Sequence, residues 1–212
     1  MRHKQLGLLV WMMLITSLVS VAQDHPQKSS KPSVSPHLTL MGFTLGKDTI
    51  ADVQKELGRS TVGRCSNEQD ASKEVCYASA APPETRVYFE AGVSGGWTQL
   101  DGFRVVSGDR VSNCGLQCPA TATVRRDIQT GGGLKIGLIK GEVLSLLGSP
   151  AHLAGNKLTF EWQSRRRMTK GEMQKSGQHP VTYPYWNVVD TIEVKLIDGR
   201  VAEFEVTHSV TD

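Results

Sequence analysis

A pattern that is typical of a short amphipathic helix occurs twice in this chain, roughly 90 positions apart. The copies lie in residues 43–60 and 134–150, and in each the apolar side chains form one stripe that can pack against a sheet. Asp48 or Thr49 is expected to cap the first helix, and a glycine follows the last apolar residue of each stripe, as is common at helix ends. The stripes consist of Ile50, Val53 and Leu57 in the first copy and of Ile139, Val143 and Leu147 in the second.

After each predicted helix the apolar period changes to two, which is typical of strands that bury one face. This order of elements predicts an α+β fold of two tandem modules, each a short helical segment packed on an antiparallel sheet. Trp97 and Trp162 lie within strand candidates and are expected to pack in the core. The strand candidates are residues 74–79, 85–91 and 97–106 in the first module and 158–162, 191–197 and 200–208 in the second.

The clearest hairpin spans residues 193–206, where Asp198 and Gly199 suit a two-residue type I′ turn. In its second strand, apolar residues such as Phe204 are expected to face one side of the sheet. The intervening Glu205 is expected to face water.

The amino-terminal residues 1–22 have the composition of a secretory signal peptide, with basic Arg2 and Lys4, an apolar run and small residues at the cleavage site. The run is shorter than a spanning helix needs, so we expect no transmembrane segment after cleavage, with an uncleaved anchor as the alternative. Residues 23–36 lack apolar periodicity and predict a flexible leader. The remaining boundaries are expected at residues 37–112 for the first helix-plus-sheet module, 113–133 for an inter-module linker and 134–212 for the second module.

The composition is that of a globular protein, with 39% hydrophobic and 21% charged residues. The 24 Lys and Arg against 21 Asp and Glu give a net charge of +3, and removal of Arg2 and Lys4 with the signal peptide lowers it to +1. Such a balance is not that of a strongly basic protein, so we expect no nucleic-acid partner.

The four cysteines are expected to form disulfides, because an exported protein folds in an oxidising compartment, periplasmic or extracellular. Four thiols allow three pairings, and proximity along the chain favours Cys65 with Cys76 and Cys114 with Cys118. A zinc site is the alternative, but no second closely spaced ligand pair accompanies the Cys-x3-Cys segment. We therefore expect neither a metal nor another cofactor.

One motif of the repeat resembles a known family. Gly46 followed by Val53-x-x-x-Leu57-Gly58 recurs as Gly137 followed by Val143-x-x-x-Leu147-Gly148. With the antiparallel sheets that follow, it resembles the β-lactamase-inhibitor-protein-like fold, which is shared with BamE/SmpA-type outer-membrane assembly lipoproteins. Two tandem copies are more similar to the inhibitor protein, whose sheets form a concave protein-binding face and whose early disulfide would correspond to Cys65 and Cys76. No lipidation cysteine follows the predicted cleavage site, unlike in the lipoproteins.

Residues 92–96 match the G-x-S-x-G motif of serine hydrolases, with Ser94 in the place of the nucleophile. That motif works at a turn from a strand into a helix, whereas here it leads into a strand pattern, so we expect a glycine-rich loop. No spacing of the histidines or carboxylates indicates a catalytic pair. The sequence therefore predicts no catalytic residue and no enzyme, with a hydrolase using Ser94 as a remaining alternative.

Residues 163–187 form an unusually long connection between strand candidates, and such connections are often functional. The resemblance and this segment together lead us to expect a non-catalytic exported protein that binds an envelope or secreted protein through its sheet face and a basic-aromatic loop. Two alternatives stay open: a structural factor in outer-membrane protein assembly, and a merely solvated arginine run beside aromatic residues that begin a strand. The expected partner-binding residues are Arg165, Arg166, Arg167, Tyr183, Tyr185 and Trp186.

Overall fold

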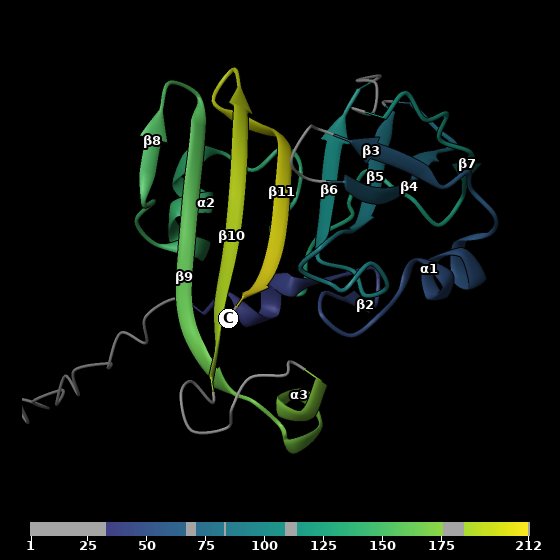
Figure 1. Ribbon diagram of the computed structural model, residues 1–212. Coiled ribbons are helices and arrows are strands. Elements are labelled where there is room, and N and C mark those ends of the chain that lie inside the picture. The colour runs from purple at the N-terminus through teal and green to yellow at the C-terminus, as the bar shows by residue number, and fades with distance from the viewer. Residues whose placement is uncertain (1–32, 67–70, 83, 109–113, 176–184, 212) are drawn as a thin grey trace, which may run out of the picture. The chain divides into compact units, whose positions relative to one another are not determined.

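In the computed structural model, the described residues are 33–66, 71–82, 84–108, 114–175 and 185–211 (Figure 1). The predicted signal peptide, most of the predicted leader and Tyr183 lie outside them. The first elements are η1 (Ser35–Leu38), β1 (Thr39–Leu40), β2 (Phe43–Thr44), α1 (Ile50–Leu57), β3 (Gly63–Ser66), β4 (Ala71–Ser79), β5 (Thr85–Ala91), β6 (Gly102–Ser107) and β7 (Ala120–Thr121). They are followed by α2 (Lys140–Leu147), β8 (His152–Ala154), β9 (Lys157–Arg167), α3 (Lys170–Lys175), β10 (Tyr185–Ile197) and β11 (Arg200–Thr211).

Within these residues nine strands form one sheet, in which the neighbours follow the order β3-β4-β5-β6-β11-β10-β9-β8 and β7 pairs with β4. All pairs along that order are antiparallel, and β6 and β11 connect the strands that follow α1 to those that follow α2. The described residues make up one compact unit. The predicted α+β class is confirmed, with short helices and a mainly antiparallel sheet.

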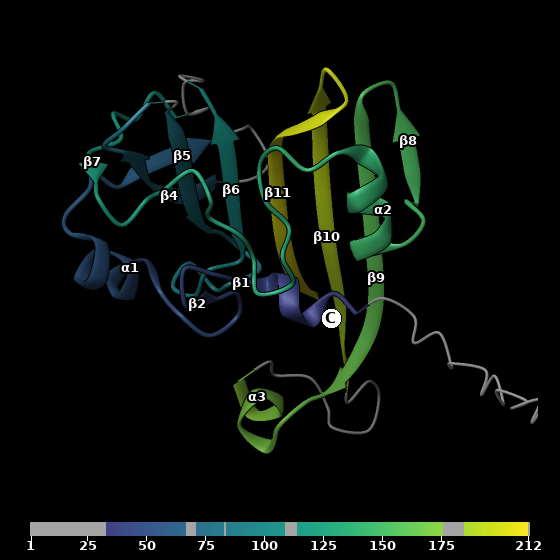
Figure 2. The ribbon, with the colours of Figure 1, turned by 180° about the vertical axis from the view of Figure 1, so that it is seen from behind.

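Both α1 and α2 cover the same face of the sheet, as the view from behind shows (Figure 2). Most of their apolar stripe residues pack with alternate strand residues in one hydrophobic cluster, but the expected place of Ile139 in the second stripe is wrong, because it precedes α2 and is 46% exposed. The opposite face of the sheet is therefore left without a helical layer among the described residues. The cluster includes Val53, Val143 and Leu147 of the helices and Val75, Phe89, Phe103, Ile192, Phe204 and Val206 of the strands.

The predicted helices are confirmed together with their ends. Thr49 caps α1 in a capping box: its hydroxyl accepts the Asp52 N–H at 3.2 Å, and the Asp52 carboxylate accepts the Thr49 N–H at 2.9 Å. Gly58 and Gly148 follow the two helices with φ of 92° and 83°, a backbone region that favours glycine.

The predicted hairpin is also confirmed. β10 and β11 pair around Asp198 and Gly199, and both turn residues have positive φ, 50° and 73°, as a type I′ turn requires.

The segment that was expected to link the modules packs closely on the rest of the chain in its described part. Val124 and Ile128 are buried in the core cluster. A Cβ at Gly131 would lie 2.7 Å from the Pro36 carbonyl oxygen, and one at Gly132 would overlap the His37 ring. Glycine is needed at position 131 because the Pro36 backbone lies closer than a Cβ allows, and at position 132 because the His37 ring fills the space.

The disulfides are present, but the pairing favoured by proximity is wrong. Cys65 is bonded to Cys114 and Cys76 to Cys118. Cys65 lies opposite Ser72, so Cys76 is four positions further along β4, which is about 13 Å and too far for a disulfide. The two later cysteines instead fasten the segment that follows β6 onto the open face of the sheet.

Candidate functional site

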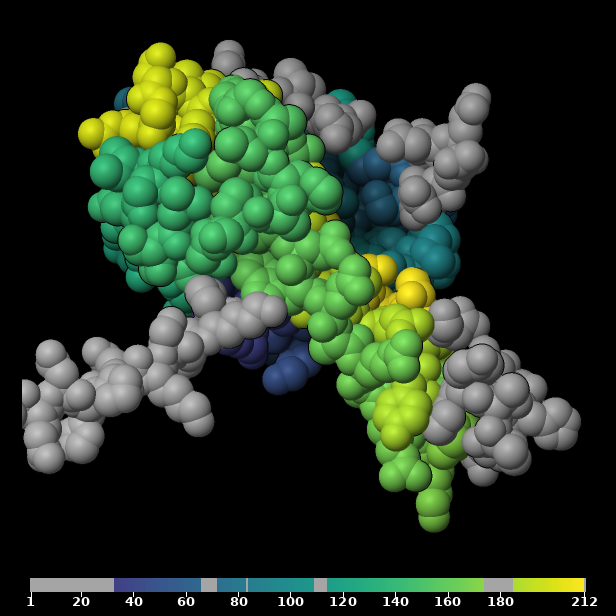
Figure 3. All heavy atoms as spheres, turned by 90° about the vertical axis from the view of Figure 1, so that its left-hand side faces the viewer, coloured from purple at the N-terminus to yellow at the C-terminus, as the bar shows by residue number. Residues whose placement is uncertain are grey.

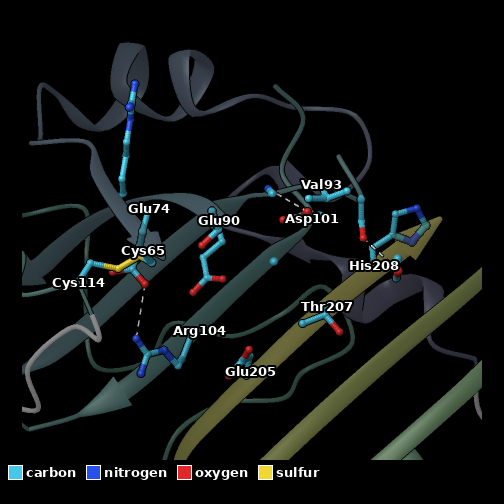
Figure 4. A pocket seen from close by; sticks show the side chains of 16 residues that line it. Cys65, Glu74, Glu90, Val93, Asp101, Arg104, Cys114, Glu205, Thr207 and His208 are labelled. Atoms are coloured by element: carbon cyan, nitrogen blue, oxygen red, sulfur yellow. Dashed lines mark hydrogen bonds and ion pairs between the residues drawn. A yellow bond between two sulfur atoms is a disulfide. The ribbon is translucent and has the colours of Figure 1, made fainter. Parts of the chain in front are cut away.

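The face of the sheet that points away from α1 and α2 carries a cavity of about 610 Å³ (Figure 4). It lies over β4, β5, β6 and β11. Side chains along a strand point alternately to the two faces, so the residues between the buried apolar ones of these strands point into the cavity. They include Glu74, Glu90, Gly102, Arg104 and Glu205.

The register of the strands decides which of these groups meet. Glu74 on β4 lies directly opposite Glu90 on β5, and Arg104 on β6 lies directly opposite Glu205 on β11. Side chains in such cross-strand positions are in contact range. Two neighbouring rows of the sheet therefore place three carboxyl groups around one guanidinium group.

Gly102 lies between these groups and leaves room above the sheet. It is directly opposite Glu90 on one side and Thr207 on the other. A Cβ at this position would lie 3.6 Å from the Glu90 Cβ and 3.7 Å from the Val206 carbonyl oxygen, which is ordinary contact. Glycine is therefore not required by the strand, and its missing side chain opens the floor of the cavity.

Glu90 holds its proton more tightly than an ordinary glutamate does. Burial raises the pKa of Glu90 to about 8, and its hydrogen bond with Glu74 and the charge of nearby Glu205 act in the same direction. At neutral pH the Glu90 carboxyl is therefore mainly protonated. Burial also raises the pKa of Glu205.

Arg104 is the buried cation of the cavity and is already engaged. Its Nη2 lies 3.6 Å from Glu74 Oε2 and its Nη1 lies 3.7 Å from Glu203 Oε1. Its guanidinium carbon lies 4.4 Å from the centre of the Tyr88 ring, which is a cation–π contact. The cavity thus has more carboxyl groups than the single positive charge of Arg104 can neutralise.

At one end of the cavity the loop after β5 is fastened by hydrogen bonds. The Asp101 carboxylate accepts the N–H groups of Gly92 at 2.9 Å and Gly95 at 3.2 Å, although burial raises the pKa of Asp101. The Ser94 and Ser209 hydroxyls lie 3.1 Å apart. From Ser94 the chain continues through turns to β6 and not into a helix, so the strand-to-helix elbow of serine hydrolases is not formed here.

His208 and Asp190 form a second ionisable pair beside this end. His208 Nδ1 lies 2.6 Å from Asp190 Oδ1, and Asp190 is buried. A Cβ at Gly46 would lie 3.0 Å from the His208 ring, so a glycine at this position makes room for the imidazole. The pair connects β10 and β11 next to the cavity.

Trp97 lies at the rim of the site, and its expected place in the core is wrong. Its side chain is 39% exposed, and its backbone has a positive φ of 65°, which is costly for a bulky residue. It lines a smaller hollow of about 310 Å³ together with Arg64, Ser72 and Lys73, and Arg64 and Ser72 also line the main cavity. The strand expected from position 97 begins only at Gly102, because residues 93–98 form turns.

The basic-aromatic segment is strand and helix more than loop in its described part. Residues 163–167 continue β9, residues 170–175 form α3, and residues 185–187 begin β10. Tyr185 and Trp186 therefore begin a strand, which agrees with one of the alternatives predicted from the sequence. Tyr185 is nevertheless 48% exposed. The connection appeared longer in the sequence because charged residues that are exposed on both faces show no apolar alternation.

The strand register separates the expected partner-binding residues into two groups. Alternation places Arg165, Arg167 and Tyr185 on the same face as the acidic cavity, and Arg166 and Trp186 on the face of the helices. Arg167 lies opposite Tyr185, and Arg166 lies opposite Trp186. Only the first group could act together with the cavity on one partner surface.

Arg166 has a partner within its own hairpin. Its guanidinium donates to both carboxylate oxygens of Glu172 at 3.1 and 2.7 Å, and Glu172 also accepts the Thr169 N–H at 2.8 Å. These hydrogen bonds, that of Arg166 first, lower the pKa of Glu172 to about 2. Arg166 thus fastens α3 to β9, which leaves Arg165 and Arg167 as the more available cations.

The cavity itself was not foreseen from the sequence. The alternation around Glu205 indicated its face correctly, but Glu205 lines a cavity instead of simply facing water. The neighbours of Glu205 come from strands far apart in the chain, and their register is set by tertiary packing. A glycine inside a strand pattern, at position 102, was the one local indication of a hollow.

One group of residues has the atom types and proximity of a metal site. Cys65, Glu74 and Cys114 offer ligand atoms within 4.8 Å of one another. The two sulfur atoms are bonded to each other, and a disulfide does not provide the thiolates that bind zinc.

Comparison of the chain with known protein families, with curated protein sequences and with solved structures finds no match. Among the described residues, no helix has the length and apolar character that a membrane crossing requires. The two disulfides fit an oxidising compartment.

Proposed function

We propose that this protein is a non-catalytic exported binding protein that holds an envelope or secreted protein on the open face of its sheet. In this proposal the acidic cavity receives a lysine or arginine side chain of the partner. The main support is the excess of carboxyl groups: among the described lining residues, Glu74, Glu90, Asp101 and Glu205 face only two arginines. Of these, Arg104 is buried and engaged.

The proton held by Glu90 gives the site a way to accept a cation. A partner's ammonium or guanidinium group favours the ionised carboxylate, so its entry would release this proton. Binding would therefore strengthen as the pH rises toward about 8, where Glu90 ionises without help. The empty position above Gly102 supplies the space, and about 610 Å³ exceeds the needs of one side chain.

Two further groups on the same face support a protein as the partner. Trp97 at the rim and Tyr185 on β10 are exposed, and Trp, Tyr and Arg are the residues that most often dominate protein interfaces. Arg165 and Arg167 lie on the Tyr185 side of the sheet. A partner would thus contact an acidic cavity and a separate basic-aromatic region on one face.

The order of the elements supports the interpretation as two tandem modules. α1 is followed in the chain by β3, β4, β5 and β6, and α2 is followed by β8, β9, β10 and β11. The last strand of each set lies beside the last strand of the other. This arrangement and the resemblance to the β-lactamase-inhibitor-protein-like fold support protein binding, and the disulfides support export to the periplasm or secretion.

The experiment is capture of partners from envelope and secreted fractions with residues 23–212 as bait, followed by mass spectrometry. The Glu74→Gln/Glu90→Gln variant keeps the shape of the cavity and removes two of its four carboxyl groups, and it should lose the partner at least tenfold. Glu56→Gln on α1 makes the same chemical change on the helical face and should retain it. Equal capture by all three baits would refute the cavity as the site.

A structural role in outer-membrane protein assembly is the second candidate, and it rests on the resemblance to the BamE/SmpA-type lipoproteins. Migration of the bait with large membrane complexes, independent of the cavity carboxyl groups, would favour it. A partner that is a single exported protein, and that is released below pH 6, would favour the binding protein.

A further inference from the structure

The outer edge of β9 is largely uncovered. β8 pairs only with Lys157, Leu158 and Thr159 at the start of this strand. From Phe160 to Arg167, no described residue pairs with that edge, while the other edge is paired with β10 throughout. Figure 3, which looks at this side of the molecule, shows β9 in green at the surface.

The backbone groups that face this edge can be assigned from the register. The Thr159 carbonyl accepts the Ala151 N–H at 2.8 Å, so it points away from β10. The pairing of β9 with β10 runs without a bulge from Lys157 to Arg167. Because alternate residues of a strand direct their N–H and C=O to the same side, the uncovered groups belong to Glu161, Gln163, Arg165 and Arg167.

The side chains along this edge carry a net positive charge. Arg165, Arg166 and Arg167 outnumber Glu161, and Arg166 is held by Glu172. Charged residues on an edge strand disfavour pairing with a like-charged edge, such as that of a second copy. An extended segment rich in Asp or Glu has the complementary charge and can use the same backbone groups.

We propose that the edge of β9 from Phe160 to Arg167 binds an extended acidic segment of the protein partner as an additional strand. This inference rests on the proposed function and names what the basic region contributes to it. Backbone hydrogen bonds with Glu161, Gln163, Arg165 and Arg167 hold the segment. The side chains of Arg165 and Arg167 select its charge.

The test uses the mature chain and three fluorescein-labelled octapeptides, with binding followed by fluorescence anisotropy. The first alternates Glu and Val, the second alternates Lys and Val, and the third is the Glu-Val peptide with its amides N-methylated along both edges. The first should bind at least tenfold more tightly than the others, because the second has the wrong charge and the third has no N–H donor on either edge. Equal binding of the methylated peptide, or no binding of the first, would overturn the inference.

Two variants locate the binding edge. Gln163→Pro removes an outward N–H and keeps the bonds between β9 and β10, because proline is tolerated where the N–H of an edge strand faces water. Arg165→Glu/Arg167→Glu reverses the selecting charge, and Arg125→Glu/Arg126→Glu is its control at exposed positions outside the hairpin. Gln163→Pro and Arg165→Glu/Arg167→Glu should no longer bind the acidic peptide, whereas the control Arg125→Glu/Arg126→Glu should bind it. Retained binding by Gln163→Pro, with its circular dichroism spectrum unchanged, would place the peptide elsewhere.

The same variants distinguish failure of strand addition from failure of the cavity as the binding site. If Gln163→Pro still captures the partner and Glu74→Gln/Glu90→Gln does not, the cavity proposal stands and strand addition is refuted. If sedimentation shows a dimer that Gln163→Pro converts to a monomer, a second copy occupies the edge, and the acidic segment is refuted.

Discussion

Glu74 and Glu90 lie directly opposite each other on adjacent strands, and their hydrogen bond adds to burial in raising the pKa of Glu90. Two carboxyl groups so placed cannot both ionise at low cost, because each would be a buried charge next to a like charge. The cost of ionisation falls on Glu90, because Glu74 is also the ion-pair partner of buried Arg104.

The contribution of Glu90 to the stability of the protein should fall as the pH rises from about 4.5 to about 8, whereas the lowered pKa of His37 acts in the opposite direction at the lower end of this window. In this window the unfolded chain releases a proton that folded Glu90 retains, because its pKa is raised from 4.5 to about 8. The expected slope is at most about 1.4 kcal/mol per pH unit for this one group, and the raised pKa values of Asp101 and Glu205 act in the same direction. Urea unfolding at several pH values measures it.

Glu90→Gln is the variant that isolates this group. Its amide can donate to the Glu74 carboxylate as the protonated acid does, but it cannot ionise. We expect a smaller slope and a protein more stable than the wild type above pH 8. Glu56→Gln on α1 should leave the slope as it is, and an unchanged slope in Glu90→Gln would contradict the raised pKa of Glu90.

A small side chain at position 102 should be tolerated, whereas a large one should prevent binding of the partner. Gly102→Ala should stabilise the protein by about 0.5 kcal/mol, because a Cβ fits and glycine is unfavourable within a strand. Gly102→Leu should fill the space above the sheet and abolish capture of the partner. Unfolding and capture assays on both variants separate the two effects, and capture by Gly102→Leu equal to that of Gly102→Ala would show that the hollow is not the site.

Thiol counting checks the two disulfides. Cys65→Ser/Cys114→Ser should leave no free thiol, because Cys76 and Cys118 remain paired, whereas Cys65→Ser/Cys76→Ser should leave two partners free. Alkylation without reductant followed by mass measurement distinguishes these results. Loss of either bond should cost about 4 kcal/mol on the chain-entropy account, since the bonds span 49 and 42 positions. The opposite thiol pattern would restore the pairing favoured by proximity.

The sequence predicted those parts of the fold that depend on local pattern. The capping of α1 at Thr49 and the turn at Asp198 and Gly199 follow from side-chain chemistry within a few residues. The pairing of Cys65 with Cys114 could not be predicted, because it depends on the register of β3 on β4 and on the path of the chain after β6. The distance between two cysteines along the chain does not determine that register.

The candidate site was predicted only where charge was concentrated in one segment. The arginines at 165–167 were visible as a run, although their division between two faces needed the strand register. The cavity combines Glu74, Glu90 and Glu205, each of which looks in the sequence like the polar position of an ordinary half-buried strand. These residues form a site only because three strand pairs bring them together.

Trp97 should matter for binding and little for stability. Its positive φ of 65° costs about 1 kcal/mol relative to glycine, and its side chain is 39% exposed, so Trp97→Gly relieves the backbone while it removes little buried area. We expect the free energy of unfolding to change by less than about 1 kcal/mol. Partner capture should fall at least tenfold, and Trp97→Phe should retain most of it because an aromatic ring remains at the rim. A large loss of stability with unchanged capture would instead make Trp97 a structural residue of the turn that closes the cavity.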